Sequence, residues 1–204
     1  MIESNIKIPT TRNAITTFNM IIEAALEKFY EGGYHGTTIN AITQHAGVAA
    51  GTFYLYFPSK MALYKHILIT LSHNIRKEIA SKVALKETRL EKEREGIKAF
   101  IQYVQKNPQM YNVIWESLYI DRNLFKEYYE SFAKRYVKGL QSAQEQGEIE
   151  TLDVEVTAYV LMGITNFVGL KVLLDLGSNN DDLEHIIDSV MMLLERGLFT
   201  PKGK

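Results

Sequence analysis

The sequence contains no cysteine and only four prolines. Without cysteine it forms neither disulfides nor cysteine-ligated zinc sites, which suits a reducing cytoplasm. Its 23 basic and 24 acidic residues nearly balance, which excludes a strongly basic nucleic-acid coat and an acidic tail. Residues 1–12 lack the apolar core of a signal peptide. The longest apolar run, residues 156–170, is shorter than the roughly 20 residues of a membrane helix. These absences predict a cytoplasmic protein with no membrane partner.

Apolar residues recur with helical spacing along nearly the whole chain. From Phe18 to Phe29 they fall at i, i+4, i+7, i+8 and i+11, one stripe of an amphipathic helix that Gly32 and Gly33 end. No strand alternation competes with this pattern, so we predict an all-α chain. In the first half of the chain, further helices are predicted from the Thr38 cap to Gly47, over about 50–56, and from Ser59 to about Ser81. The next begins in the charged segment 86–95 and ends at Asn107, and a short helix that runs through Trp115 follows it. The last three are predicted over about 122–146, 153–176 and 181–196, and residues 177–180 separate the final two.

Residues 36–60 predict two short helices joined by a tight turn at Gly47. We term the second of them, residues 50–56, the recognition helix. Phe53 and Phe57 lie one helical turn apart and can anchor this helix to the core. Its other side chains then face outward, as a DNA-binding helix-turn-helix requires.

The outward positions of the recognition helix carry small and polar side chains. Gly51 permits close approach to a DNA groove, and Thr52 can contact a thymine methyl group or a base edge. Tyr54 and Tyr56 offer hydroxyl groups to phosphates. Lys60 adds a positive charge beside the N-terminus of the next helix, a position already suited to phosphate. This pattern points to a gene regulator.

Residues 22–63 contain a series of short motifs in a fixed order. They are Ala24-Ala25, Gly33-Tyr34, Thr37-Thr38, Ile42, Gly47-Val48, Gly51-Thr52-Phe53-Tyr54, Tyr56-Phe57 and Ser59-Lys60. This series resembles the tetracycline-repressor (TetR/AcrR) family. The resemblance implies a three-helix DNA-binding domain, residues 1–58, followed by a helical ligand-binding and dimerisation domain, residues 59–204. It also implies that the recognition helix enters the major groove of DNA and that the residue at the start of the preceding helix contacts the backbone. The candidate DNA-binding residues are therefore Thr38, Ala50, Gly51, Thr52, Tyr54, Leu55, Tyr56 and Lys60.

The sequence also departs from the family pattern in its polar and basic residues. Ala49 and Ala50 stand where the family often has a capping hydroxyl and a basic residue, and residues 16–19 lack the usual basic residues. Residues 1–76 contain six basic and four acidic side chains, a net charge of +2. So few charges predict modest non-specific DNA affinity with a shallow salt dependence, which Lys7 and Arg12 can partly offset.

The region from Ile97 to Phe167 is rich in tyrosine and phenylalanine. Aromatic residues at helical spacing usually belong to the core, but cavities for organic ligands are also built from apolar walls with a few hydroxyls. The family resemblance implies such a cavity, with no cofactor and a mainly apolar effector, either aromatic or acyl-bearing. An acyl-CoA is compatible, although no phosphate cradle is visible. The first candidates for ligand contact are Tyr103, Trp115, Tyr119, Phe132 and Phe167.

The last two predicted helices carry apolar side chains around a large part of their circumference, more than the core of one protomer easily buries. A four-helix interface between two copies covers them, and the family dimerises in this way. A two-fold dimer predicts a palindromic operator whose half-sites lie one or more DNA turns apart, with one turn being roughly 34–36 Å. The expected function is that of a ligand-responsive regulator. By family default it is a repressor, released from DNA when the ligand shifts the helix that starts at Ser59.

Two other classes of function stay open at this point. The five histidines have no metal-binding spacing, and no nucleophile has a visible base, so we expect neither a metal site nor an enzyme. A helical enzyme remains the second class, which turnover of a bound compound would favour. A helical adaptor that uses the motif for protein contacts is the third.

Overall fold

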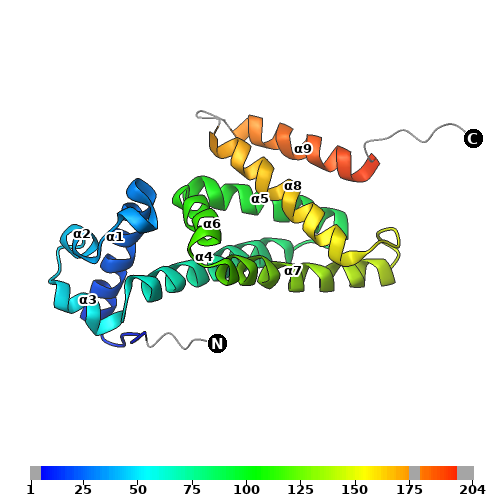
Figure 1. The fold of residues 1–204 in the computed structure, drawn as a ribbon. Helices are drawn as coiled ribbons and strands as arrows, with labels where there is room; N and C mark the ends of the chain where they lie inside the picture. The colour runs from blue at the N-terminus through cyan, green and yellow to red at the C-terminus, as the bar shows by residue number, and fades with distance from the viewer. Residues whose placement is uncertain (1–5, 175–179, 197–204) are drawn as a thin grey trace, which may run out of the picture. The chain divides into compact units, whose positions relative to one another are not determined.

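A computed structural model describes residues 6–174 and 180–196 of the chain, and this part is helical with no strand (Figure 1). The prediction of an all-α chain is confirmed. The helices are α1 (Arg12–Gly36), α2 (Ile39–His45), α3 (Ala50–Tyr56), α4 (Lys60–Val83), α5 (Arg89–Lys106), α6 (Gln109–Ile120), α7 (Arg122–Glu145), α8 (Val154–Leu174) and α9 (Asn180–Arg196). Residues 175–179, which contain most of the predicted break before the last helix, lie outside the described residues.

The helix boundaries near the N-terminus follow from local capping chemistry. The Thr38 hydroxyl accepts a hydrogen bond from the Ala41 N–H at 3.1 Å, which satisfies one free donor at the start of α2. Gly47 ends this region with a φ of 67°, a left-handed conformation that glycine adopts without steric cost. α3 then starts after Ala49 without any side-chain cap. The two predicted short helices and the turn between them are present.

Two boundaries differ from the sequence prediction. Gly33 does interrupt α1, with φ 67° and ψ 172°, but helical turns resume and continue to Gly36. α6 extends beyond Trp115 to Ile120. Its last residues carry no proline or glycine, so the helix continues until Asp121 takes up an extended conformation.

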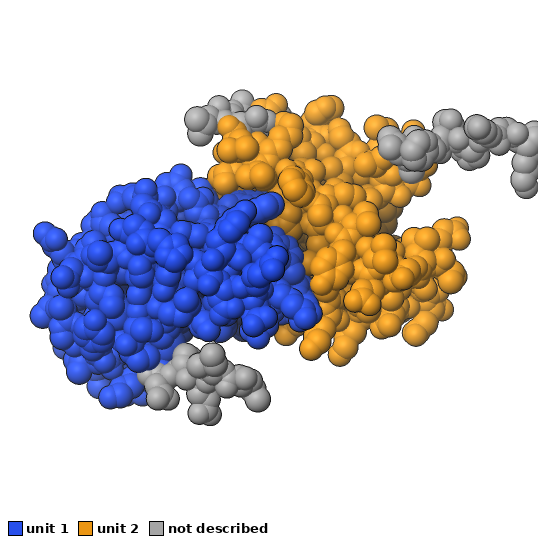
Figure 2. Space-filling view, viewed as in Figure 1, with its two compact units in different colours: residues 1–74, 108–132 blue, residues 75–107, 133–204 orange. Residues whose placement is uncertain are grey.

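The chain divides into two compact units, shown in different colours in Figure 2. Unit 1 contains residues 1–74 and 108–132, and unit 2 contains residues 75–107 and 133–204. The first unit therefore combines α1–α3 with the start of α4, all of α6 and the start of α7. The domain division at residues 58 and 59 stays a prediction.

The core of unit 1 is dominated by aromatic side chains from α1, α3 and α4. The Phe18 and Phe57 rings stack with centroids 4.9 Å apart, and the His66 ring meets the Phe18 ring edge-on at 5.3 Å. Tyr64 is fully buried and packs against Phe29 at 5.4 Å. Burial lowers the pKa of His66, because the charged imidazolium is poorly solvated there. This core fixes α3 against α1 and α4.

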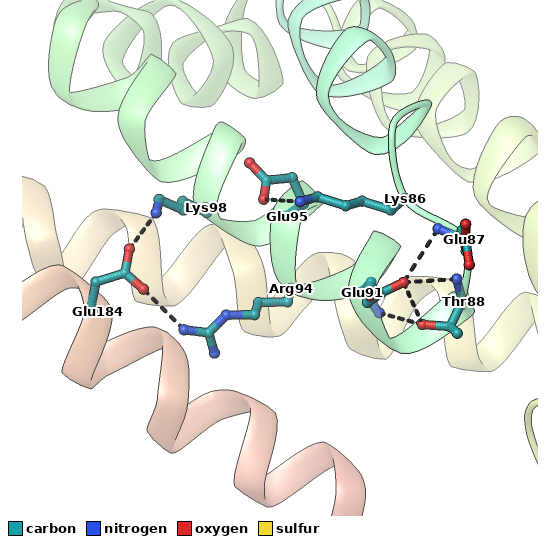
Figure 3. Close-up of polar contacts among 8 residues, drawn as sticks. All are labelled: Lys86, Glu87, Thr88, Glu91, Arg94, Glu95, Lys98 and Glu184. Atoms are coloured by element: carbon teal, nitrogen blue, oxygen red, sulfur yellow. Dashed lines mark hydrogen bonds and ion pairs between the residues drawn. The ribbon is translucent and has the colours of Figure 1, made fainter.

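Unit 2 is held together by an apolar cluster and by ion pairs. Leu140, Ala158 and Leu161 form the centre of the cluster, which joins α7 to α8. The carboxylate of Glu184 on α9 binds Lys98 and Arg94 on α5, and its distance to the Arg94 guanidinium is 2.9 Å (Figure 3). These pairs fix one face of α9 against α5.

The start of α5 is closed by a capping box. The Thr88 hydroxyl accepts a hydrogen bond from the Glu91 N–H, and the Glu91 carboxylate accepts one from the Thr88 N–H at 3.0 Å (Figure 3). Glu93 lies one turn after Arg89, the first residue of the helix. It is buried and binds both the Arg89 guanidinium and the Tyr136 hydroxyl. The charged segment at residues 86–95 therefore contains the predicted helix start, but Glu93 within it is buried and not solvated as expected.

α8 is the most apolar helix of the described residues. It spans 21 residues with a mean hydropathy of 1.6 over its most apolar stretch, so its length and composition alone would allow it to cross a membrane. This differs from the prediction, because the helix extends past both ends of the apolar run. Core helices of soluble proteins pass the same test, which makes it weak evidence. Ala158, Leu161 and Met162 do bury one side of α8 within the protomer.

Replacement of the buried anchor of α3 tests this packing. We expect Phe53→Ala to lower the free energy of unfolding by ~3–5 kcal/mol, because a fully buried ring leaves a cavity. Tyr54→Ala, the matched change on the exposed side of the same helix, is expected to cost no more than about 0.5 kcal/mol. Urea denaturation of both variants measures the difference. Equal losses would contradict the packing described for α3.

Candidate nucleic-acid interface and effector residues

α3 has one buried side and one exposed side. Phe53 and Phe57 are 0% exposed, and their rings lie 5.7 Å apart. Tyr54 and Leu55 are 57% and 59% exposed. This side of the helix is therefore open to a large partner, while the two phenylalanines hold the other side in the core.

The remaining positions of α3 and the start of α2 add small groups to this surface. Ala50 and Gly51 are exposed, and Thr52 is half-buried. A Cβ atom added to Gly51 would meet no atom within 4 Å, so packing within the protomer does not require glycine there. Thr38 is exposed, although its hydroxyl is already engaged in capping α2. The space in front of Gly51 is consistent with close approach by an external partner.

Tyr56 has a mixed environment. Its side chain is half-buried, and its ring meets Phe18 edge-on at 5.5 Å. Its carbonyl oxygen accepts a hydrogen bond from the Lys7 N–H at 3.0 Å. Tyr56 therefore also fixes the segment before α1, which we term the N-terminal arm (residues 6–11), against the end of α3.

Lys60 is bound to the main chain at the end of α1. Its ammonium group donates to the carbonyl oxygens of Tyr34 and Thr37, each at 2.5 Å, and lies 4.3 Å from the centre of the Tyr34 ring. Burial lowers the pKa of Lys60, and the nearby Glu116 carboxylate opposes that shift. A phosphate contact by Lys60 stays a prediction, and it would have to compete with these partners.

The basic residues of the N-terminal region differ in what they contact. Lys28 pairs with Glu31 at 2.7 Å, and Lys65 lies 3.4 Å from the Asp121 carboxylate. Lys7 and Arg12 are exposed and form no ion pair with the residues that the structure describes. The N-terminal arm and the first residue of α1 therefore carry the cations that are most available to a polyanion.

The five predicted effector residues lie on four helices. Trp115 and Tyr119 on α6 and Phe132 on α7 belong to unit 1, whereas Tyr103 on α5 and Phe167 on α8 belong to unit 2. Tyr119 and Phe167 are 83% and 63% exposed, and Trp115 is 39% exposed. Tyr103 and Phe132 are half-buried. The predicted set therefore includes strongly exposed rings as well as partly enclosed ones.

An aromatic cluster on α7 surrounds one of these residues. The Phe132 ring lies 5.2 Å from Tyr128, Tyr128 lies 5.2 Å from Tyr129, and Tyr129 lies 4.8 Å from Phe125. Burial raises the pKa of Tyr129 to about 12, so this phenol is neutral at physiological pH. Burial also raises the pKa of Tyr111 on α6, with a smaller contribution from Tyr129. The sequence signal for this cluster is the i, i+3, i+4 and i+7 spacing that starts at Phe125.

Comparison with known proteins agrees with the geometry of α1–α3. The family model described as "Bacterial regulatory proteins, tetR family" matches residues 21–67. The fatty acid metabolism regulator protein of Bacillus subtilis is 36% identical over 74 residues, which are 34% of this chain and 38% of that protein. The transcriptional activator FasR of Mycolicibacterium smegmatis is 27% identical over 49% of this chain and 46% of that protein. The chain thus matches less than half the length of these two relatives.

The fold is similar over a much larger part of the chain. The crystal structure of the regulator FadR from Bacillus subtilis in complex with stearoyl-CoA superposes with a TM-score of 0.75 and 25% identity. The match covers 89% of this chain and 100% of that one. Residues 21–67 of the chain thus match the tetR family of bacterial regulatory proteins, and the helical fold is similar to that of FadR over most of the chain.

Proposed function

We propose that this protein is a ligand-responsive, DNA-binding transcriptional regulator and not an enzyme. The observation that carries the proposal is the exposed face of α3, where Tyr54 and Leu55 lie open to solvent while Phe53 is fully buried. A helix with this orientation can enter the major groove of DNA. In this proposal residues 1–58 bind DNA, and residues 59–204 bind the effector and form the dimer.

The proposed contacts within this face divide by chemistry. Gly51 and Thr52 approach base edges, and Tyr54 and Leu55 extend the contact along the groove. Thr38, Tyr56 and Lys60 are the proposed contacts to phosphates. Ala50 is exposed at the start of α3 and is the proposed contact at that end of the helix. The small number of available cations makes shape and base contacts more important than net charge.

The proposed effector is a mainly apolar molecule with an acyl chain. One structural neighbour was solved with stearoyl-CoA, and one relative is named for fatty acid metabolism. The candidate residues Tyr103, Trp115, Tyr119, Phe132 and Phe167 supply aromatic rings, and the two tyrosines also supply hydroxyl groups. Binding of the effector releases a repressor from its operator, which requires a higher affinity for the released conformation.

The proposed dimer forms through α8 and α9 of two copies. The exposed side of α8 carries an apolar stripe at helical spacing that comprises Val156, Tyr159, Val160 and Leu174. Met192 and Leu193 are also exposed on α9. Because the ion pairs of Glu184 fix the opposite side of α9 on α5, this apolar side is left for a partner. A second copy related by a two-fold axis covers it, and the operator is then palindromic.

Selection of bound duplexes from a random pool tests the function. We expect enrichment of an inverted repeat, and we expect stearoyl-CoA to weaken binding of that repeat by about 5- to 150-fold, the usual range for coupled sites. Fluorescence anisotropy with and without the acyl-CoA measures the ratio. Failure to bind any duplex at low salt would favour the helical adaptor, whereas turnover of the acyl-CoA would favour an enzyme.

The salt dependence of operator binding tests the role of the N-terminal arm. We expect Lys7→Ala and Arg12→Ala each to reduce the slope of log K against log salt by about 1, because each removes one phosphate contact. Lys28→Ala is the matched control, since Lys28 is paired with Glu31. The same slope in all three variants and the wild type would show that the arm does not touch DNA.

An acidic residue on the exposed stripe tests the dimer. We expect Val160→Glu to shift the protein to monomers at micromolar concentration, since it would bury a charge in an apolar interface. Leu85→Glu, at an equally apolar exposed position after α4, is the control and is expected to stay dimeric. Sedimentation velocity distinguishes the two states. A wild-type monomer would rule the dimer out.

A further inference from the structure

The end of α1 contains a backbone conformation that only glycine adopts readily. Gly33 has φ 67° and ψ 172°, and the next residue, Tyr34, donates its N–H to Oε1 of Glu116 on α6 at 2.6 Å. A Cβ atom on residue 33 would lie 2.7 Å from the same oxygen, closer than real Cβ contacts allow. The glycine and the carboxylate are thus fitted to each other, and any larger residue would displace the Glu116 side chain.

Two further side chains complete this contact. Lys60, at the start of α4, donates to the carbonyl oxygens of Tyr34 and Thr37. The Thr37 hydroxyl lies 2.8 Å from the carbonyl oxygens of both Lys28 and Gly33, to which it donates. We term the set of Gly33, Tyr34, Thr37, Lys60 and Glu116 the α1–α6 junction. The side chains of the junction bind main-chain groups that lose their helical partners where α1 is interrupted, namely the Tyr34 N–H and the carbonyl groups of Gly33, Tyr34 and Thr37.

α6 is also bonded to α4 on either side of Glu116. The hydroxyl of the buried Tyr64 donates to the Val113 carbonyl at 2.5 Å, and Lys65 pairs with Asp121 directly after the helix. Glu116 is the one charged residue among the twelve of α6, and it directly follows Trp115. An effector that moves the aromatic side chains of α6 therefore acts on the helix that holds the end of α1.

We propose that Glu116 is a positioning residue that transmits the state of α6 to α1 and thereby to α3. This inference rests on the proposed function, because it names the route by which the effector changes DNA binding. A hydrogen bond from an amide N–H to a half-buried carboxylate is stronger than one between neutral groups. When α6 shifts, the Glu116 carboxylate keeps its hydrogen bond to the Tyr34 N–H only if the chain segment at Gly33 moves with it. Movement of this segment changes the orientation of α1–α3.

Operator affinity and its response to an acyl-CoA test the proposal. Operator affinity is measured with and without stearoyl-CoA for the wild type, Glu116→Ala, Glu116→Gln and Glu127→Gln. The operator is the duplex that the wild type selects. Glu116→Ala is expected to bind the operator at least fivefold more weakly and to lose most of the acyl-CoA response. Its affinity for stearoyl-CoA alone is expected to change by less than twofold. Glu116→Gln retains an acceptor oxygen for the Tyr34 N–H and is expected to keep part of the response.

The controls separate coupling from folding. Glu127→Gln removes an exposed acid from α7 and is expected to behave as wild type. Gly33→Ala, which displaces the same carboxylate from the other side, is expected to reproduce the effect of Glu116→Ala. A folded Glu116→Ala protein with wild-type operator affinity and a wild-type response would overturn the proposal.

Amide hydrogen exchange tests the junction independently of DNA. The Tyr34 amide is expected to be protected in the wild type and to exchange at least tenfold faster in Glu116→Ala. Unchanged exchange would contradict the junction. A wild type that binds no duplex would instead contradict the proposed function, and the exchange result would still decide whether Glu116 holds the end of α1.

Discussion

The burial of Phe53 and Phe57 is the interaction on which the other features of the N-terminal region depend. The Phe53 ring packs against Phe57, and Phe57 packs against Phe18 and the His66 ring. Together they hold a helix of seven residues that is too short to be stable alone. Because its inner side is fixed, its outer side is presented in one orientation. The proposed DNA-binding role of α3 depends on this constraint more than on the charge of the region.

The sequence predicted this part of the molecule well because its signals are local. Helical spacing, the Thr38 cap and the left-handed glycine at position 47 each act within a few residues, and all three are present in the structure. The buried or exposed state of Phe53, Tyr54 and Leu55 follows from their positions around one turn of helix. Such patterns do not depend on distant parts of the chain.

The contacts that lay beyond prediction join segments far apart in the sequence. Nothing near Lys60 indicates that its ammonium group binds carbonyl oxygens at the end of α1, and nothing near Glu116 indicates a bond to Tyr34, 82 residues away. Gly33 was expected only to end a helix, whereas its conformation also makes room for a carboxylate from α6. The effector residues were chosen by residue type, and their division between two units depends on packing that residue type does not encode.

Photo-crosslinking from α3 is the most direct test of its role. A benzophenone amino acid replaces either Tyr54 or Tyr30, two exposed tyrosines on different helices, and the protein is irradiated on its selected duplex. The account predicts crosslinks to bases of the duplex from position 54 and none from position 30. A stable protein–DNA complex that crosslinks from position 30 but not from position 54 would contradict it.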